Sequence, residues 1–296
     1  MIAIKKSATI AIVGKPNVGK STLLNTIGKK KIAITSYKPQ TTRNQIKFNF
    51  SNDKLDLVII DTPGFHFARN KLDLFLNSEI KKTFKICDLV LFLVDPTRPV
   101  DEEDLEIIKF IKSYKITKVV LVITKTDVVS QGSINNHINK IKEAITPIAE
   151  IAISAKNGQL QPLFDCIYDH LDDGVKEIEK IDENDNFTIC EIIREQVILN
   201  CKKEIPYSTG VIVTKTNYDQ SKNIFNIFAN IIVEKKSQKP IIIAKNGSMI
   251  KRIGTESRKQ LLELYDCKIN LKLFVKVDEN WRNDQIVLKN LGYSNK

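Results

Sequence analysis

The sequence has no apolar stretch of the roughly 20 residues that a helix needs to cross a bilayer. Its longest apolar run, residues 89–94, has the length of a buried β-strand. The segment before the first apolar strand, residues 1–7, is too short to hold the hydrophobic region of a secretory signal. We therefore expect a cytoplasmic protein that associates with a membrane surface at most peripherally.

Cysteine is scarce and shows no pattern. The number of cysteines is odd, and none of their spacings matches a metal-binding motif. Scattered cysteines of this kind are typical of small core residues in a reducing compartment. The five positions are Cys87, Cys166, Cys190, Cys201 and Cys267.

Acidic residues are few relative to basic ones. The chain has 35 Asp and Glu against 46 Lys and Arg, a net charge of +11 and a pI near 9.2. A basic balance favours a polyanionic partner, either nucleic acid or an anionic membrane surface. The length of 296 residues is sufficient for two domains, each with a sizeable core.

The most informative motif is the stretch of residues 14–21, GKPNVGKS. It lies between an apolar run and a predicted helix start, which is the context of a phosphate-binding loop. Its glycines let backbone N–H groups surround an anion, and the helix N-terminus adds its positive end. We expect Lys20 to reach the β- and γ-phosphates of a nucleotide and the Ser21 hydroxyl to ligate Mg²⁺. The predicted nucleotide contacts here are Gly14, Lys15, Pro16, Asn17, Val18, Gly19, Lys20, Ser21 and Thr22.

Short β-branched runs alternate with helical patterns from residue 7 to about residue 172. This alternation predicts an α/β fold with a mostly parallel sheet and helices on both of its faces. Such a sheet binds its ligand at the carboxyl ends of its strands, so further motifs should converge there. The expected strands are 8–13, 46–50, 55–60, 89–94, 118–123 and 150–153, and the expected helices are 20–28, 72–85, 101–113, 134–146 and 160–171.

A second motif, Asp-Thr-Pro-Gly, directly follows the predicted strand at residues 55–60. Asp61 can hold Mg²⁺ through a water molecule, and the Gly64 N–H can meet the γ-phosphate. Taken alone, the same four residues are also consistent with a turn that caps a strand. The predicted nucleotide contacts of this motif are Asp61, Thr62, Pro63, Gly64 and Phe65.

The polar segment 37–43 lies between these two motifs. Such a loop can order over the γ-phosphate when a threonine hydroxyl reaches Mg²⁺, and it can relax after hydrolysis. Thr42 is the candidate and Thr41 the alternative, although an ordinary loop would have the same composition. The predicted catalytic residues are Lys20, Thr42 and Gly64, and the predicted magnesium ligands are Ser21, Thr42 and, through water, Asp61.

A third motif, Thr-Lys-Thr-Asp, follows the apolar strand at residues 118–123. Asp127 can accept the N1–H and the 2-amino group of guanine. Adenine would leave that carboxylate unpaired, so discrimination should be large. A loop after the next strand, Ser-Ala-Lys, can close over the base. The predicted base contacts are Thr124, Lys125, Thr126, Asp127, Ser154, Ala155 and Lys156.

In their order and strand-end positions, these motifs resemble those of the translation-factor class of GTPases. That class usually carries Asn where this chain has Thr124; a threonine keeps a hydroxyl but loses the amide, so we expect a weaker tie between the phosphate loop and the base loop. GTPases with Pro-Asn in the phosphate loop can use K⁺ near the β–γ bridge, which makes Asn17 a candidate ligand. Phe65 stands where Ras-like proteins carry a water-orienting Gln, so we expect slow hydrolysis of GTP to GDP and phosphate.

A charged stretch without an apolar face, residues 175–186, indicates a linker. We therefore expect a GTPase domain over 1–174 and a second domain over 187–296. The second domain should open with a helix from residue 187 to about residue 199 and continue with strands near 207–214 and 224–234.

The second domain contains a basic loop between an apolar run, Ile241 to Ile243, and a predicted helix. We expect the apolar run to be a strand. Residues 235–259 hold eight basic side chains and one acidic one, Glu256, whereas a solvated helix face normally mixes signs. A basic loop at a helix N-terminus can hold a nucleic-acid backbone beside an apolar groove for bases.

This second domain resembles an α+β KH domain of type II, whose loop is written Gly-x-x-Gly. Ala244 stands at the first glycine, where positive φ would be costly, and Gly247 matches the second. The single tryptophan, Trp281, is expected to cover the core rather than to stack on a base. The RNA contacts that the resemblance implies are Ala244, Lys245, Asn246, Gly247, Met249, Ile250, Lys251 and Arg252.

One GTPase domain followed by one KH domain resembles the family of bacterial ribosome-assembly GTPases. The resemblance implies a monomeric, GTP-gated protein that binds the 3′ end of small-subunit ribosomal RNA, assists small-subunit assembly and associates peripherally with the inner membrane. Two other classes stay open. One is a metabolic or transport NTPase whose basic tail binds lipids, and the other is a regulatory GTPase whose second domain holds a protein.

Overall fold

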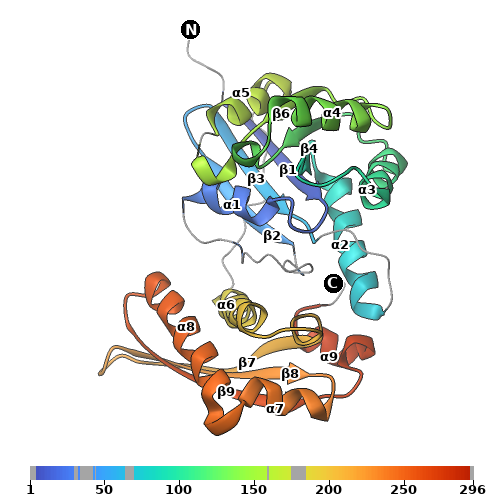
Figure 1. The fold of residues 1–296 in the computed structure, drawn as a ribbon. Helices are drawn as coiled ribbons and strands as arrows, with labels where there is room; N and C mark the ends of the chain where they lie inside the picture. The colour runs from blue at the N-terminus through green and yellow to red at the C-terminus, as the bar shows by residue number, and fades with distance from the viewer. Residues whose placement is uncertain are drawn as a thin grey trace. The chain divides into compact units, whose positions relative to one another are not determined.

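The structure is a computed structural model that describes residues 5–29, 33, 43, 45–63, 70–158, 160–174 and 185–293 (Figure 1). The chain divides into two units. The first comprises Met1–Phe67 and Leu76–Asp182, and the second comprises Ala68–Phe75 and Glu183–Lys296. Thr41, Thr42, Gly64, Phe65 and the predicted linker residues 175–184 lie outside the described residues.

A six-stranded sheet with the order β2-β3-β1-β4-β5-β6 forms the first unit. β1 is central, and all neighbours are parallel except β2, which runs antiparallel to β3. The predicted mostly parallel sheet is confirmed, and its strand bounds differ from the prediction by at most two residues. The strands are β1 (Lys6–Gly14), β2 (Ile46–Ser51), β3 (Leu55–Asp61), β4 (Leu89–Val94), β5 (Val119–Ile123) and β6 (Ala149–Ala152).

Helices cover both faces of this sheet, so the side chains of the central strand are buried on either side. Ala11 and Val13 of β1 join a core with α2, α3 and α4. Ile10 and Ile12 point to the opposite face, since strand side chains alternate, and they are fully buried as well. The helices of this sheet are α1 (Lys20–Gly28), α2 (Lys71–Ile86), α3 (Glu102–Ser113), α4 (Gln131–Lys142) and α5 (Gln161–His170).

The second unit is a three-stranded sheet with the order β7-β8-β9. β7 is antiparallel to β8, and β9 is parallel to it. Helices α6, α7 and α8 contribute Ile193, Ile242 and Ile253 to one core with the strands, which gives the predicted α+β arrangement. The elements are α6 (Asp185–Asn200), β7 (Thr209–Asp219), β8 (Ile224–Val233), α7 (Lys239–Ile243), α8 (Ser248–Leu264), β9 (Lys268–Val277) and α9 (Gln285–Asn290).

The prediction of a strand at Ile241 to Ile243 was wrong, because these residues form the end of helix α7. Pro240 occupies its first turn, where the missing N–H has no intrahelical partner to lose. Ile242 is fully buried, whereas Ile241 is 48% exposed. The periodicity of a three-residue apolar run cannot separate a strand from a short helix.

Trp281 is fully buried, as predicted, and lies in a short 3₁₀ turn after β9. Its indole Nε1–H donates to the Ser208 carbonyl at 3.0 Å, which satisfies its one polar group. No helix among the described residues is both long and apolar enough to cross a membrane.

Candidate nucleotide site and basic loop

The loop from Gly14 to Ser21 connects β1 with α1 at the carboxyl edge of the sheet. Gly14 has φ +153°, and a Cβ there would lie 2.5 Å from the Leu93 carbonyl oxygen. Gly19 has φ +105° and Asn17 φ +66°, and asparagine tolerates the left-handed region better than most residues. The chain therefore needs glycine at both ends of the loop, as the motif predicted.

Side-chain donors bind the carbonyl oxygens of this loop. Lys20 Nζ donates to the Gly14 and Lys15 oxygens, both at 2.9 Å. Arg98 Nη2 donates to the Pro16 oxygen at 3.0 Å.

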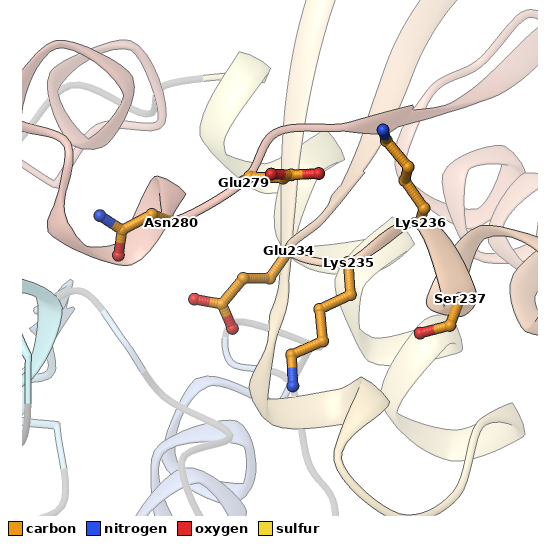
Figure 2. Close-up of a pocket in the computed structure, with 6 residues that line it drawn as sticks. All are labelled: Glu234, Lys235, Lys236, Ser237, Glu279 and Asn280. Carbon is orange, nitrogen blue, oxygen red and sulfur yellow. The ribbon is translucent and has the colours of Figure 1, made fainter.

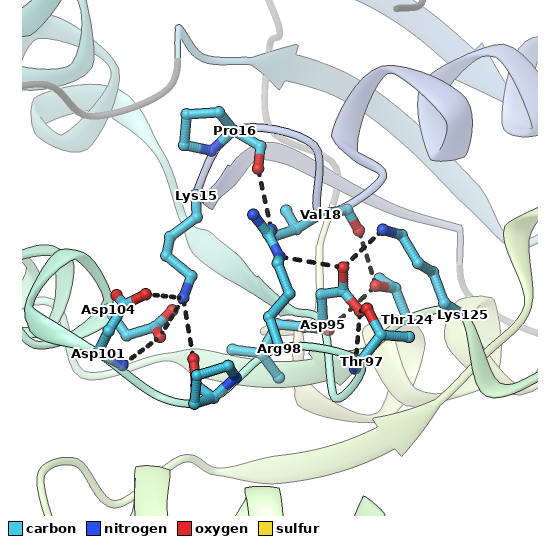
Figure 3. A network of polar contacts seen from close by, with 12 residues as sticks. Lys15, Pro16, Val18, Asp95, Thr97, Arg98, Asp101, Asp104, Thr124 and Lys125 are labelled. Atoms are coloured by element: carbon cyan, nitrogen blue, oxygen red, sulfur yellow. Dashed lines mark hydrogen bonds and ion pairs between the residues drawn. The ribbon is translucent and has the colours of Figure 1, made fainter. Parts of the chain in front are cut away.

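Thr124 ties the base loop to the phosphate loop (Figure 3). Its hydroxyl lies 2.7 Å from the Val18 carbonyl oxygen and 3.0 Å from the Val94 carbonyl oxygen. A hydroxyl carries one hydrogen, so the two acceptors share it. Although threonine lacks the amide of the usual asparagine, the tie between the two loops is present.

Lys15 projects away from the phosphate loop and is only 3% exposed. Its ammonium lies 2.9 Å from Asp101 Oδ2 and 2.7 Å from Asp104 Oδ2, at the N-terminus of α3 (Figure 3). Both carboxylates also form the capping box of that helix. The side chain of Lys15 thus anchors the phosphate loop to the N-terminus of α3.

Two residues that the motifs did not single out, Asp95 and Arg98, join these loops from the β4–α3 connection. Asp95 Oδ2 lies 2.5 Å from Lys125 Nζ and 3.3 Å from Arg98 Nε. Burial alone would raise the pKa of Asp95, but hydrogen bonds from Lys125 and Thr97 outweigh it and hold that pKa below its ordinary value. Asp95 therefore stays ionised and fixes the Lys125 stem beside the predicted base site.

The predicted magnesium ligands that the structure describes lie together. Ser21 Oγ donates to Asp61 Oδ2 at 3.0 Å, and Asp61 is fully buried at the end of β3. Hydroxyl and carboxylate oxygens at one point are the hard ligands that Mg²⁺ prefers. The oxygens of Ser21 and Asp61 therefore fit Mg²⁺. The neighbouring Thr62 hydroxyl donates to the Ile12 carbonyl oxygen at 2.8 Å, which fixes the backbone directly after Asp61.

The predicted base contacts also converge. Ser154 Oγ donates to Asp127 Oδ1 at 2.8 Å, and this bond lowers the pKa of the exposed Asp127. Thr26 of α1 donates to the Ala155 carbonyl oxygen at 2.9 Å. Asp127 is therefore an ionised, oriented acceptor, which is what guanine N1–H and its 2-amino group require.

The basic loop of the second unit has the backbone of a glycine loop. Ala244 has φ +58° and ψ −178°, a region almost restricted to glycine. Asn246 and Gly247 follow with φ +55° and +70°, and Gly247 is the N-cap of α8. The alanine thus adopts the conformation of the missing glycine and bears the strain.

Apart from Ala244 and Gly247, which shape the backbone of the loop, the predicted RNA contacts divide into two groups. The exposed group consists of Lys245, Asn246, Lys251 and Arg252. Met249 and Ile250 are half-buried and pack against the core, so they border the loop as apolar surface.

An open pocket of the second unit lies elsewhere and has mixed charge (Figure 2). Glu234 there pairs with Arg282. With acids and lysines balanced, this pocket is poorly suited to a polyanion. Its lining residues are Glu234, Lys235, Lys236, Ser237, Glu279 and Asn280.

Comparisons with known protein families agree with both units. The profile described as 50S ribosome-binding GTPase matches residues 9–125, and the profile described as KH domain matches residues 204–282. The protein is therefore a GTPase with a KH domain.

Among curated proteins, GTPase Era of Ureaplasma parvum serovar 3 is 45% identical over 295 residues, which cover 98% of each chain. GTPase Era of Ruminiclostridium cellulolyticum is 40% identical over 292 residues, 97% of each chain. This chain belongs to the GTPase Era family.

Two solved structures share the fold over the whole chain. A crystal structure of an Aquifex aeolicus Era variant bound to GDP and AlF4⁻ has a TM-score of 0.90, 31% identity and coverage of 98% of this chain and 99% of that one. A crystal structure of Era in complex with MgGDPNP and nucleotides 1506–1542 of 16S ribosomal RNA has a TM-score of 0.92 and 30% identity, with the same coverage.

The tie made by Thr124 is testable. Thr124→Val removes the hydroxyl, leaves the Val18 oxygen without that donor, and should weaken GDP binding by about tenfold, as expected for a lost buried hydrogen bond. Thr124→Ser keeps the hydroxyl and serves as the control. Equal GDP dissociation constants of Thr124→Val and the wild type, measured with a fluorescent GDP analogue, would contradict the role.

The buried Lys20 predicts a pH dependence of nucleotide binding. Burial lowers its pKa to about 8; Asp61 opposes this shift and Arg98 adds to it. Only the protonated amine pairs with phosphate, so GDP affinity should fall as the pH rises through about 8, by up to about tenfold per pH unit. Lys20→Arg remains charged and should have a flat profile by titration calorimetry; parallel profiles for the two proteins would refute the assignment.

The strain at Ala244 predicts a stabilising substitution. Ala244→Gly should raise the free energy of unfolding of the second unit by about 1 kcal/mol, the lower end of the cost of such a backbone conformation. Ser248→Gly is the control, because Ser248 has φ −60° and glycine there should destabilise α8. Urea denaturation followed by Trp281 fluorescence measures both; a loss of stability in Ala244→Gly would show that the strain is absent.

Proposed function

We propose that this GTPase is a nucleotide-controlled RNA-binding protein that binds the 3′ end of small-subunit ribosomal RNA and assists small-subunit assembly. The observation that carries the proposal is the loop at residues 244–247, which keeps a glycine-type backbone even with alanine in it and exposes Lys245 beside α8. A backbone of this shape lets a phosphate chain approach closely. The relative solved with 16S ribosomal RNA nucleotides supports the choice of RNA.

The nucleotide site supplies the control. Lys20 would hold the phosphates, and Ser21 and Asp61 would hold Mg²⁺. When bound, the ion would neutralise charge on the β- and γ-phosphates. Asp127, held by Ser154, would select guanine. Arg98 donates to the Pro16 carbonyl and so helps to fix the shape of the loop.

The two activities are linked in this proposal. GTP would order the segments around Thr42 and Asp61, and that order would change RNA affinity. Since linkage is reciprocal for binding, RNA should change GTP affinity by the same factor. Lys20→Ala should abolish both nucleotide binding and the response of RNA affinity to nucleotide.

The loop assignment is tested by Lys245→Ala/Lys251→Ala. Because both side chains are exposed cations beside the loop, the variant should bind an RNA of the small-subunit 3′ end at least tenfold more weakly. It should also lower the slope of log affinity against log salt by about two. The control is Lys235→Ala/Lys236→Ala, which removes two positive charges from the pocket of mixed charge at residues 234–237, here called the mixed pocket. Filter binding at several salt concentrations decides, and unchanged RNA affinity in the loop variant would refute the assignment.

We also propose that Asn17 helps to bind K⁺ near the β–γ bridge, where the ion would stand in for an arginine finger. Its left-handed backbone, φ +66°, supports an unusual loop conformation at this position. Hydrolysis should be faster in potassium than in sodium buffer, and Asn17→Ala should lose the difference. Equal rates of GTP hydrolysis in the two buffers would overturn this part.

For cellular placement, we propose a monomer in the cytoplasm that acts on the small ribosomal subunit and contacts the inner membrane face peripherally. The net charge of +11 supports both polyanionic surfaces. Co-sedimentation with purified small subunits and with anionic vesicles separates them. Binding to vesicles but not to subunits would favour the alternative of a lipid-binding NTPase.

A further inference from the structure

The sheet of the second unit has one face packed against helices and one that is open over most of its length. Ile227, Ala229 and Ile231 of β8 point into the core. The intervening residues of β8 and their partners on the neighbouring strands form the opposite face, which we call the open face. Its central residues are Ile212, Lys215, Asn217, Asn226, Phe228, Asn230, Asn270, Lys272 and Phe274.

One end of the open face is covered by the chain itself. A Cβ at Gly210 would lie 3.1 Å from Leu291 and 3.6 Å from Trp281, so these residues pack on the face at that end. Beyond it the strands carry exposed or half-buried side chains, and Phe274 of the edge strand β9 is 54% exposed.

Two aromatic rings lie at the centre of the open face. Phe228 pairs with Lys272 in the register, and Asn230 pairs with Phe274. The rings therefore lie on the same face at diagonal positions of the adjacent parallel strands β8 and β9. Lys272 Nζ lies 5.5 Å from the centroid of the Phe228 ring. Flat rings beside a cation are the elements on which single-stranded bases stack.

The charge of the open face has one sign near the rings. Among the described strand residues of this face, the one acid is Asp219, and it sits at the hairpin tip. Its carboxylate accepts from the Ser221 N–H at 3.1 Å and the Ser221 hydroxyl at 2.6 Å, so it is used within the turn. The lysines of this face are Lys215, Lys268, Lys272 and Lys276.

Amide side chains fill the positions between the rings and the lysines. Asn270 Nδ2 donates to Asn226 Oδ1 at 2.8 Å, which leaves each amide with further donor or acceptor capacity. Amides can pair with the edges of unstacked bases. The three kinds of side chain on this face match three parts of an RNA strand: rings match base faces, amides match base edges, and lysines match phosphates.

We propose that the open face binds single-stranded RNA as a second surface, separate from the loop at residues 244–247. A membrane surface would be met by a continuous apolar face with cations along its border, whereas here Asn230 and Lys272 lie directly beside the two rings. The inference extends the proposed RNA-binding function, on which it rests, by a distinct site. It lengthens the strand that one molecule can hold.

The test compares two double variants of the full-length chain. Phe274→Ala/Lys272→Ala removes one ring and one charge from the open face. The matched control, Leu262→Ala/Lys236→Ala, removes one exposed apolar side chain of α8 and one exposed lysine of the mixed pocket. The probe is a fluorescein-labelled oligouridylate of about 20 nucleotides, longer than one typical single-strand site, and anisotropy gives its dissociation constant.

We expect the open-face variant to bind the oligouridylate about tenfold more weakly, the effect of one lost stacking contact, and the control variant to bind as the wild type. The same factor should appear when Lys245→Ala/Lys251→Ala is added, because separate surfaces contribute independently. With 4-thiouridine in the probe, irradiation should attach RNA to the peptides that contain Phe228 or Phe274. The open-face variant and the control variant should keep the wild-type melting temperature and the basal GTP hydrolysis rate.

The inference is overturned if the open-face and control variants bind the oligouridylate equally. It is also overturned if the open-face variant loses only binding to anionic vesicles, which would make the face a lipid surface, or only binding to purified ribosomal proteins. The loop variant distinguishes the two proposals. If it loses RNA and the open-face variant does not, the second surface fails alone; if it binds RNA as the wild type does, the proposed function fails at the loop.

Discussion

A loop that turns its N–H groups toward an anion must turn its carbonyl groups elsewhere, and those carbonyls need donors of their own. This constraint governs the first unit. Lys20 bonds the Gly14 and Lys15 oxygens, and Arg98 and Thr124 bond those of Pro16 and Val18. These side chains therefore hold the loop in shape through its carbonyl groups, without a nucleotide, and phosphate binding needs little rearrangement.

The donors come from three places in the chain, which is why the β4–α3 connection belongs to the nucleotide site. Asp95 holds both Arg98 and Lys125, so the segment that shapes the phosphate loop also positions the base loop. Lys15 adds a fixed point on α3. Phosphate binding and base selection thus depend on one shared polar network, and a change in Asp95 would disturb both.

The sequence was sufficient for what local pattern determines. The strands of the first unit, its helices to within four residues, the phosphate loop, and the grouping of Ser21 with Asp61 and of Asp127 with the loop at Ser154 followed from periodicity and from strand-end positions. The roles of Asp95 and Arg98 could not be predicted from local pattern, because they depend on partners up to 82 residues away in the sequence. The run at 241–243 was misassigned because β-branched residues favour strands and a run of three is too short for its periodicity to indicate a helix. The left-handed backbone of Ala244 could not be predicted from the sequence, because tertiary context rather than intrinsic propensity holds this alanine at φ +58°.

The irregularity in β7 between Val213 and Lys215 decides which side chains the open face displays. Strict two-residue alternation from Val211 and Val213 would send Lys215 and Asn217 toward the core. The extra residue, Thr214, inverts the phase and turns them outward, and its hydroxyl bonds the Phe228 carbonyl at the same point. Removal of any one residue of 213–215 would restore a continuous alternation without changing the phase on either side, whereas removal of one residue elsewhere in the strand would turn the following side chains to the other face. The strand therefore tolerates a shortening by one residue at a single place, and relatives of different length should differ there first.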